Sequence, residues 1–289
     1  MAKKLTGYRP DGCLIEDVPS LAPELRADDG LNLPERVDLR AFCSPVEDQG
    51  TIGSCAANAV VGALEYHQRL ARQPATDLSR LFVYYNSRRL ADKENEDSGT
   101  FIHHVMASVL AYGACPENMW PYQPSAWSTK PTDACYAAAN GFGAVSYART
   151  PLGASCKAAV AAGLPVVFGI SLPFEMLMLE AGATGEIQRP TSGQWPTPSG
   201  GHAMLIVGYD DTIGKWLVRN SWGADWGNAG HVLIDYDVMA HYSHPHAYWT
   251  IGAIEQRAGL SLTGPTPAAA ADLTKSQASS QVANALAQL

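Results

Sequence analysis

The stretch from Gln49 to about Leu70 constrains the fold and the chemistry of this chain more than any other. It begins QGTIGSC up to Cys55, and an alanine-rich run with apolar residues at helical spacing follows. This pattern predicts a turn of small residues that leads into a helix starting at the cysteine. A thiol at a helix N-terminus feels the positive end of the helix dipole, which favours the thiolate. Cys55 is therefore a candidate nucleophile, against the alternative of a small core residue.

Two blocks in the second half of the chain carry the residue types that such a nucleophile needs. His202 lies in GGHAMLIVGY (200–209), and Asn220 lies in KWLVRNSWG (215–223). A histidine can take up the proton of a thiol and return it to a leaving amine. Cys, His and Asn thus occur in the order and roles of a thiol protease.

With these blocks the chain resembles the papain-like cysteine peptidases of the cathepsin group. It is similar to a divergent, bacterial-type member of that family. The resemblance covers about residues 33–255 and rests on LPERVDLR (33–40), the Cys55 block, DSGTF (97–101), the His202 block and NSWGADWG (220–227). It implies an α+β, papain-like two-lobed fold, with a helical lobe that carries Cys55 and a sheet- or barrel-like lobe that carries His202 and Asn220. The active site is then expected in the cleft between the lobes.

The resemblance also implies a role for each candidate catalytic residue. Cys55 is the nucleophile, His202 the acid and base, and Asn220 the group that holds the imidazole. The side-chain amide of Gln49 and the backbone N–H of Cys55 are implied as the donors that stabilise the oxyanion. Trp222 is expected to lie over the bond between His202 and Asn220 and to exclude water.

Substrate is expected to bind in an extended form, pairing its backbone with Gly99 or Thr100 and with the carbonyl of Gly201. Phe101 is expected to wall the pocket for the second residue before the cut. Glycines at 200 and 201 stand where many relatives carry larger residues. We therefore expect a roomy pocket that prefers an apolar side chain.

The chain departs from the family's common pattern close to the nucleophile. Ala56 stands where an aromatic residue is usual, and Ile52 stands where the family has a disulfide partner, so that bridge cannot form. Six cysteines occur in all, and a chain of this length does not need disulfides. We expect it to tolerate a reducing compartment, with Cys115 and Cys135 as the pair most worth testing.

Composition divides the chain into three regions. Residues 1–32 are rich in Pro, Asp and Gly and stand where the family has an inhibitory prosegment, so we expect them to lie extended and cover part of the cleft; a disordered leader is the alternative. Residues 33–262 are expected to form the catalytic domain, with a helical lobe over about 41–140 and a β lobe over about 141–262. Residues 263–289 are a low-complexity tail.

Hydrophobic spacing predicts individual elements within this domain. Helices are predicted from 55 to about 70 and over 101–112, the second ended by Gly113. Short β-branched or alternating runs predict strands at 165–170, 203–209, 216–219 and 231–236.

Charge and hydropathy limit the partners. A net charge of -8 leaves no basic surface for nucleic acid or an anionic membrane as the principal partner. No stretch of about 18 apolar residues occurs, and the N-terminus lacks the apolar run of a secretory signal. We expect no membrane span, and either a cytoplasmic location or export by a non-classical route. The expected molecule is a monomer that acts on proteins or peptides without a cofactor, with its own N-terminal segment as intramolecular inhibitor.

The activity expected first is that of an endopeptidase that forms a thioester acyl-enzyme and is made as an autoinhibited precursor. A papain-fold binding module without turnover is an alternative, but it would lack Cys55, His202, Asn220 or Gln49, and all four are present. Acyl transfer or isopeptide cleavage would use the same groups and stays open. A metal site is not expected, because the histidines at 241, 244 and 246 fit no standard zinc spacing.

Overall fold

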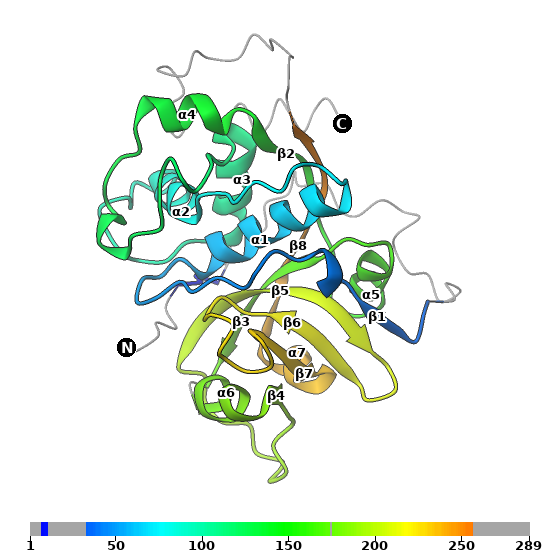
Figure 1. The fold of residues 1–289 in the computed structure, drawn as a ribbon. Coiled ribbons are helices and arrows are strands. Elements are labelled where there is room, and N and C mark those ends of the chain that lie inside the picture. Colours follow the sequence, from blue (N-terminus) through cyan, green and yellow to red (C-terminus); the bar gives the residue numbers. More distant parts are fainter. Residues whose placement is uncertain (1–6, 11–32, 174, 257–289) are drawn as a thin grey trace.

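The computed structural model describes residues 7–10, 33–173 and 175–256. The tail at 263–289 and the remainder of 1–32 lie outside the described residues. The helices of the first half lie together in the upper part of Figure 1: α1 (Cys55–Leu70), α2 (Arg80–Arg89), α3 (Ile102–Tyr112) and α4 (Asp133–Ala139). Helix α1 runs between the other three and the sheet, and it contacts α2 and α3 on one side and β5 on the other.

Within the described residues, eight strands form one sheet in the order β2-β8-β3-β5-β6-β7-β4, with β1 paired to β5. The strands are β1 (Arg36–Asp38), β2 (Phe142–Arg149), β3 (Val166–Leu172), β4 (Glu186–Ile187), β5 (Gly200–Asp210), β6 (Lys215–Arg219), β7 (His231–Asp235) and β8 (Ser243–Gln256). Their pairing is antiparallel except between β4 and β7. Helices α5 (Ala154–Ala161), α6 (Ala181–Thr184) and α7 (Tyr236–Tyr242) connect strands of this sheet.

The helices and strands that were predicted from the spacing of apolar residues are confirmed. Helix α1 begins at Cys55 and ends at Leu70, and α3 ends before Gly113, whose φ of 73° few other residues adopt. Strands β3, β5, β6 and β7 fall on the four predicted runs. Strand β8 was not predicted, because its start contains Pro245 among polar residues and so lacks the pattern of a strand.

Two clusters of buried apolar side chains stabilise the molecule on either side of α1 and β5. The first joins α1, α2 and α3 and also takes in Trp249 and Ile251 of β8. The second lies among the sheet, α5 and α7, with Phe168 and Trp216 among its large members. Helix α1 therefore packs against the sheet through apolar side chains. None of the helices in the described ranges is both long and apolar enough to cross a membrane.

Candidate active site

Cys55 is the first residue of α1, and its side chain is fully buried. The turn before the helix is held by Ser54, whose hydroxyl lies 2.5 Å from that of Tyr122 and 3.0 Å from the side-chain amide nitrogen of Asn58. The backbone N–H of Ala203, on β5, donates to Cys55 Sγ over 3.4 Å. The predicted nucleophile thus lies where the helical part and the sheet meet.

His202 precedes Ala203 on β5, so it adjoins the backbone N–H that reaches Cys55 Sγ. Its Nε2 lies 2.8 Å from Oδ1 of Asn220, the residue that follows β6. Because a side-chain amide oxygen only accepts, this bond assigns the hydrogen to Nε2. Nδ1 is buried and has no hydrogen-bond partner within the described residues. The nitrogen that is left to exchange a proton with the thiol is therefore Nδ1.

Trp222 packs against the imidazole of His202. Its ring centre lies 4.9 Å from that of His202, with 34° between the ring planes. Asn220 is 3% exposed, and its Oδ1 also accepts a 2.8 Å bond from the backbone N–H of Ser221. With two donors on one oxygen, the amide cannot rotate without breaking both bonds.

Gln49 is fully buried beside the same segment. Its Oε1 accepts a 2.7 Å bond from the hydroxyl of Ser221, and its Nε2 donates to the carbonyl of Ile52 over 3.1 Å. A side-chain amide has two N–H donors, so one remains for a substrate oxygen. Ser221 stands within the NSWG block, yet no sequence pattern marks it as the residue that orients Gln49.

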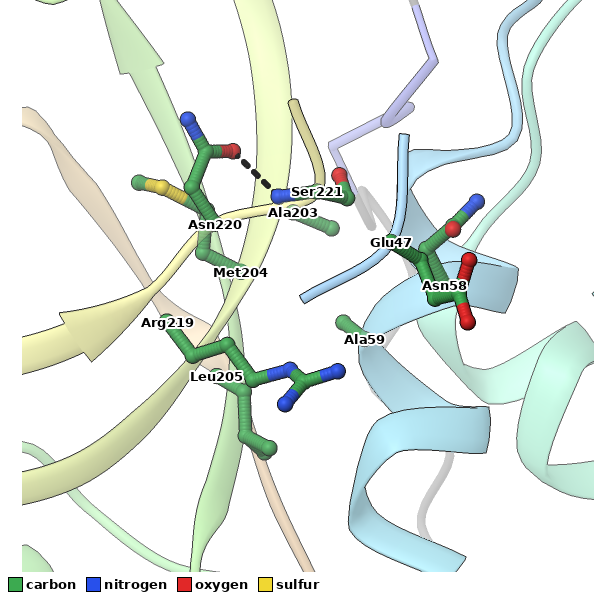
Figure 2. A pocket seen from close by; sticks show the side chains of 9 residues that line it. All are labelled: Glu47, Asn58, Ala59, Ala203, Met204, Leu205, Arg219, Asn220 and Ser221. Atoms are coloured by element: carbon green, nitrogen blue, oxygen red, sulfur yellow. Dashed lines mark hydrogen bonds between the residues drawn. The ribbon is translucent and has the colours of Figure 1, made fainter. Parts of the chain in front are cut away.

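Arg219 fixes the segment that leads to Gln49. Its guanidinium donates to the carbonyl of Ser44, to the Ser44 hydroxyl over 3.2 Å and to the carbonyl of Pro45 over 2.6 Å. Figure 2 shows this side chain reaching from β6 toward α1 and Ala59, beside Asn220. The end of β6 thus leads into Asn220 and, through Arg219, holds the chain segment that leads to Gln49.

The papain family cysteine protease model matches residues 33–247 of this chain. The chain belongs to the papain family of cysteine proteases. A peptidase C1-like protein of Acanthamoeba polyphaga mimivirus is 33% identical over 218 residues, which are 71% of this chain and 68% of the viral protein. The thiol protease aleurain of Arabidopsis thaliana is 31% identical over 219 residues, 70% of this chain and 56% of aleurain. The chain therefore spans a little over half the length of that plant relative.

Solved structures agree with this assignment. The crystal structure of xylellain, a cysteine protease from Xylella fastidiosa, superposes with a TM-score of 0.75 at 33% identity and covers 88% of this chain and 98% of the xylellain chain. Digestive procathepsin L 3 of Tenebrio molitor superposes with a TM-score of 0.59 at 23% identity, over 83% and 76% of the two chains, which shows the shared fold. The protein is a cysteine-type peptidase with the α+β papain-like fold.

Cys55 and His202 are both fully buried, and burial shifts the pKa of each. It raises the pKa of the Cys55 thiol to about 12, although the N–H groups of Ala203 and Ala56 favour the thiolate. It lowers the pKa of the His202 imidazole to about 4, against the effect of the bond to Asn220. The sequence predicted a lowered thiol pKa. This structure instead favours neutral thiol and imidazole, because no water reaches either group.

Residues 7–10 account for part of this burial. A Cβ placed on Gly7 would lie 2.6 Å from Cys55 Sγ, so the backbone of Gly7 rests directly on the thiol. The N–H of Thr100 donates to the carbonyl of Gly7 over 3.0 Å, and the N–H of Arg9 donates to the carbonyl of Thr100 over 3.2 Å. These bonds form a parallel bridge between Tyr8 and Thr100.

Of the predicted substrate-binding residues, Thr100 and Gly201 contact this segment. A Cβ on Gly201 would come 2.5 Å from the carbonyl oxygen of Tyr8, which needs a glycine there. Gly99 instead lies against the nucleophile turn, since a Cβ on Gly53 would come 3.1 Å from its nitrogen. The guanidinium of Arg9 lies over the ring of Phe101, with 5.2 Å between its Cζ and the ring centre.

Among the described residues, the cysteines other than Cys55 form no disulfide. Cys43, Cys115, Cys135 and Cys156 are free thiols, and those of Cys115 and Cys135 lie in hydrogen-bond contact. Across residues 7–10, 33–173 and 175–256, no cluster of three or more His, Cys, Asp or Glu side chains is placed to hold a metal ion.

Proposed function

We propose that this peptidase is a cysteine endopeptidase that works through Cys55, His202 and Asn220 and is made as an autoinhibited precursor. The observation that carries the proposal is the continuous chain of contacts from Asn220 Oδ1 to His202 Nε2 and, through the next residue on β5, from the N–H of Ala203 to Cys55 Sγ. Nucleophile, base and orienting group then stand in the order that thiol catalysis requires.

The first half of the reaction uses each group once. When substrate replaces residues 7–10, the thiol proton passes to His202 Nδ1 and Cys55 Sγ attacks the scissile carbonyl carbon. The side-chain amide of Gln49 and the N–H of Cys55 bind the oxyanion. As the C–N bond breaks, His202 gives its proton to the leaving amine, and a thioester on Cys55 remains.

The second half restores the enzyme. His202, now neutral, takes a proton from a water molecule, whose oxygen attacks the thioester carbonyl. The tetrahedral intermediate collapses with release of the Cys55 thiolate, which recovers the proton from His202. Trp222 and the bond to Asn220 keep the imidazole in one orientation through both halves, because rotation would expose that bond to water.

Inhibition by the N-terminal segment follows from how residues 7–10 bind. A scissile carbonyl must point at Gln49 and the N–H of Cys55, but the carbonyl of Gly7 is already bonded to the N–H of Thr100. The bond after Gly7 is therefore held against the thiol in an orientation that does not favour attack. The buried side chain of Tyr8 fills the pocket next to it, and we expect substrates to place an apolar side chain there.

The test uses the full chain and peptide reporters with an apolar residue in the second position before the cut. We expect little turnover by the wild type, and at least about tenfold more by Tyr8→Ala, because that change removes the buried ring that anchors the segment. Pro10→Ala, an exposed position in the same segment, is the matched control and should keep the inhibition. Cys55→Ser in the Tyr8→Ala chain should abolish turnover.

Two results would contradict separate parts of the proposal. If folded Tyr8→Ala neither cleaves any reporter nor reacts at Cys55 with a thiol-directed epoxide, the chain is not an active endopeptidase. If wild type and Tyr8→Ala cleave equally fast, the segment does not inhibit.

A further inference from the structure

We propose that Tyr84 and Asp97 are positioning residues for catalysis, which together fix the peptide group before Gly53 and thereby the side-chain amide of Gln49. The inference rests on the proposed function, in which that amide binds the oxyanion. Neither residue has to touch the substrate, because both act through the turn that leads into Cys55.

Asp97 binds this turn directly. Its Oδ1 accepts a 2.9 Å bond from the backbone N–H of Gly53, which stands just before Ser54 and Cys55. The same oxygen accepts a 2.5 Å bond from the hydroxyl of Tyr84, a fully buried side chain on α2. The turn is thus bonded to the helical part of the molecule through one carboxylate oxygen.

The peptide group between Ile52 and Gly53 transmits this bond to Gln49. Its N–H donates to Asp97, and its C=O accepts a 3.1 Å bond from Gln49 Nε2. Because a peptide group is planar, the orientation of the N–H also fixes the direction of the C=O. If Asp97 no longer accepts, the plane loses one of the bonds that orient it. The amide of Gln49 would then shift with the carbonyl or lose its own bond.

Tyr84 links the turn to the segment that we expect to pair with substrate. A phenol hydroxyl donates one hydrogen bond and can accept another. That of Tyr84 donates to Asp97 and accepts from the backbone N–H of Gly99 over 3.3 Å. Gly99 precedes Thr100, whose N–H and C=O are bonded to residues 7–10. One hydroxyl therefore joins the two sides of the substrate site.

Arg88 holds both Tyr84 and the chain that leads to Asp97. It is 1% exposed, and its guanidinium Cζ lies 3.9 Å from the centre of the Tyr84 ring. Its Nη1 donates to the carbonyls of Glu94 and Glu96 over 2.9 and 2.7 Å. The ring and the chain before Asp97 are thus fixed to the same buried cation, which limits how far Tyr84 and Asp97 can separate.

The first test compares Asp97→Leu with Asp97→Asn in the full-length Tyr8→Ala chain. The side-chain oxygen of asparagine accepts the same two bonds, whereas leucine is similar in size and accepts neither. We expect Asp97→Leu to lower kcat about tenfold to 100-fold and to change KM by less than about threefold, because the oxyanion donor acts in the transition state. Asp97→Asn should keep kcat within about threefold of the Tyr8→Ala chain.

Tyr84→Phe, made in the same chain, separates positioning from stability and decides the question if Asp97→Leu does not fold. Tyr136→Phe is the matched control, since Tyr136 is buried on α4 and its hydroxyl donates to Asn86 over 2.7 Å. Both changes should lower the melting temperature by similar amounts. Only Tyr84→Phe should also lower kcat, by about fivefold or more, and raise KM, because the N–H of Gly99 loses its acceptor.

Equal kcat and KM in folded Tyr84→Phe and Tyr136→Phe, or equal falls in kcat in Asp97→Asn and Asp97→Leu, would overturn the inference. A readout without turnover keeps it separate from the proposed function. By NMR, the amide hydrogens of Gly53 and Gly99 should exchange with solvent at least about tenfold faster in Tyr84→Phe than in Tyr136→Phe. If no chain cleaves any reporter, the proposed function fails. Faster exchange then still supports the hold of Tyr84 and Asp97 on the turn, and unchanged exchange overturns that as well.

Discussion

At the scale of single residues, the site depends on Ser221 for the orientation of two side-chain amides. Ser221 donates its hydroxyl to Gln49 and its backbone N–H to Asn220. It thereby orients the side chains of both Gln49 and Asn220, and Asn220 in turn is bonded to His202. The sequence predicted Gln49, Asn220 and His202 from their motifs, but Ser221 could not be recognised, because its partner Gln49 is distant in the chain and only folding brings the two together.

Loss of the Gln49 amide should lower kcat far more than it changes KM. Gln49→Ala removes one donor to the oxyanion, which is typically worth about 100- to 1000-fold in kcat. Ser221→Ala leaves the amide in place but free to rotate, so we expect a smaller fall in kcat. Steady-state kinetics in the Tyr8→Ala chain measure both. A Gln49→Ala variant with wild-type kcat would show that the amide does not contact the oxyanion.

Acid should destabilise the covered form through His202. The buried imidazole has a pKa of about 4, below its ordinary 6.5, so the folded state resists protonation while the unfolded chain does not. The stability it contributes is present above pH 6.5 and is lost as the pH falls from 6.5 toward 4. Between pH 7 and pH 5 the wild type should lose about 2 kcal/mol more unfolding free energy than His202→Gln.

Urea unfolding of both proteins at the two pH values measures this difference. His67, whose pKa burial also lowers to about 4, is present in both proteins, so its contribution cancels. Equal losses in wild type and His202→Gln would mean that His202 is not buried neutral in solution.

At the scale of elements, the site is built where α1 meets β5 and β6. Helix α1 and strand β5 could be predicted because their spacing is local, and the nucleophile and base were placed with them. A pocket walled by Phe101 was predicted, but the contact of Tyr8 with Gly201 was not, because the two residues lie far apart in the chain and Tyr8 carries no motif. Strand β8, which contains His244, was not predicted, because the proline and polar residues at its start do not follow the pattern of a strand.

Arg219 should matter to stability and catalysis together. It is 5% exposed and donates to the carbonyls of Ser44 and Pro45, so Arg219→Met leaves the buried carbonyl of Ser44 without this donor. We expect a loss of about 2 kcal/mol or more in unfolding free energy, and a fall in kcat of about tenfold to 100-fold as Gln49 shifts.

Arg189→Met is the matched control. Arg189 pairs with Asp237 with both side chains 61% exposed, and we expect its loss to change the unfolding free energy by less than about 0.5 kcal/mol. If Arg219→Met matches this control in stability and kcat, Arg219 does not position the oxyanion donor.

At the scale of the whole molecule, the central claim is that a neutral, covered Cys–His pair becomes a nucleophile when residues 7–10 leave the cleft. In the described structure Gly7 covers the thiol and Tyr8 fills the adjacent pocket. Removing the segment would readmit water and substrate, which relieves the burial that holds both groups neutral. The start of α1 and the strands β5 and β6 thus supply the site residues, and residues 7–10 cover them.

The most direct test is to trap the acyl-enzyme. The Tyr8→Ala chain is mixed with a p-nitrophenyl ester of a peptide that carries tyrosine in the second position, quenched in acid during turnover and weighed intact by mass spectrometry. We predict an adduct with the mass of the acyl group, located on Cys55 by digestion and absent in Cys55→Ser. Turnover by Cys55→Ser at the same rate, or a folded Tyr8→Ala chain that forms no adduct and releases no product, would contradict the account.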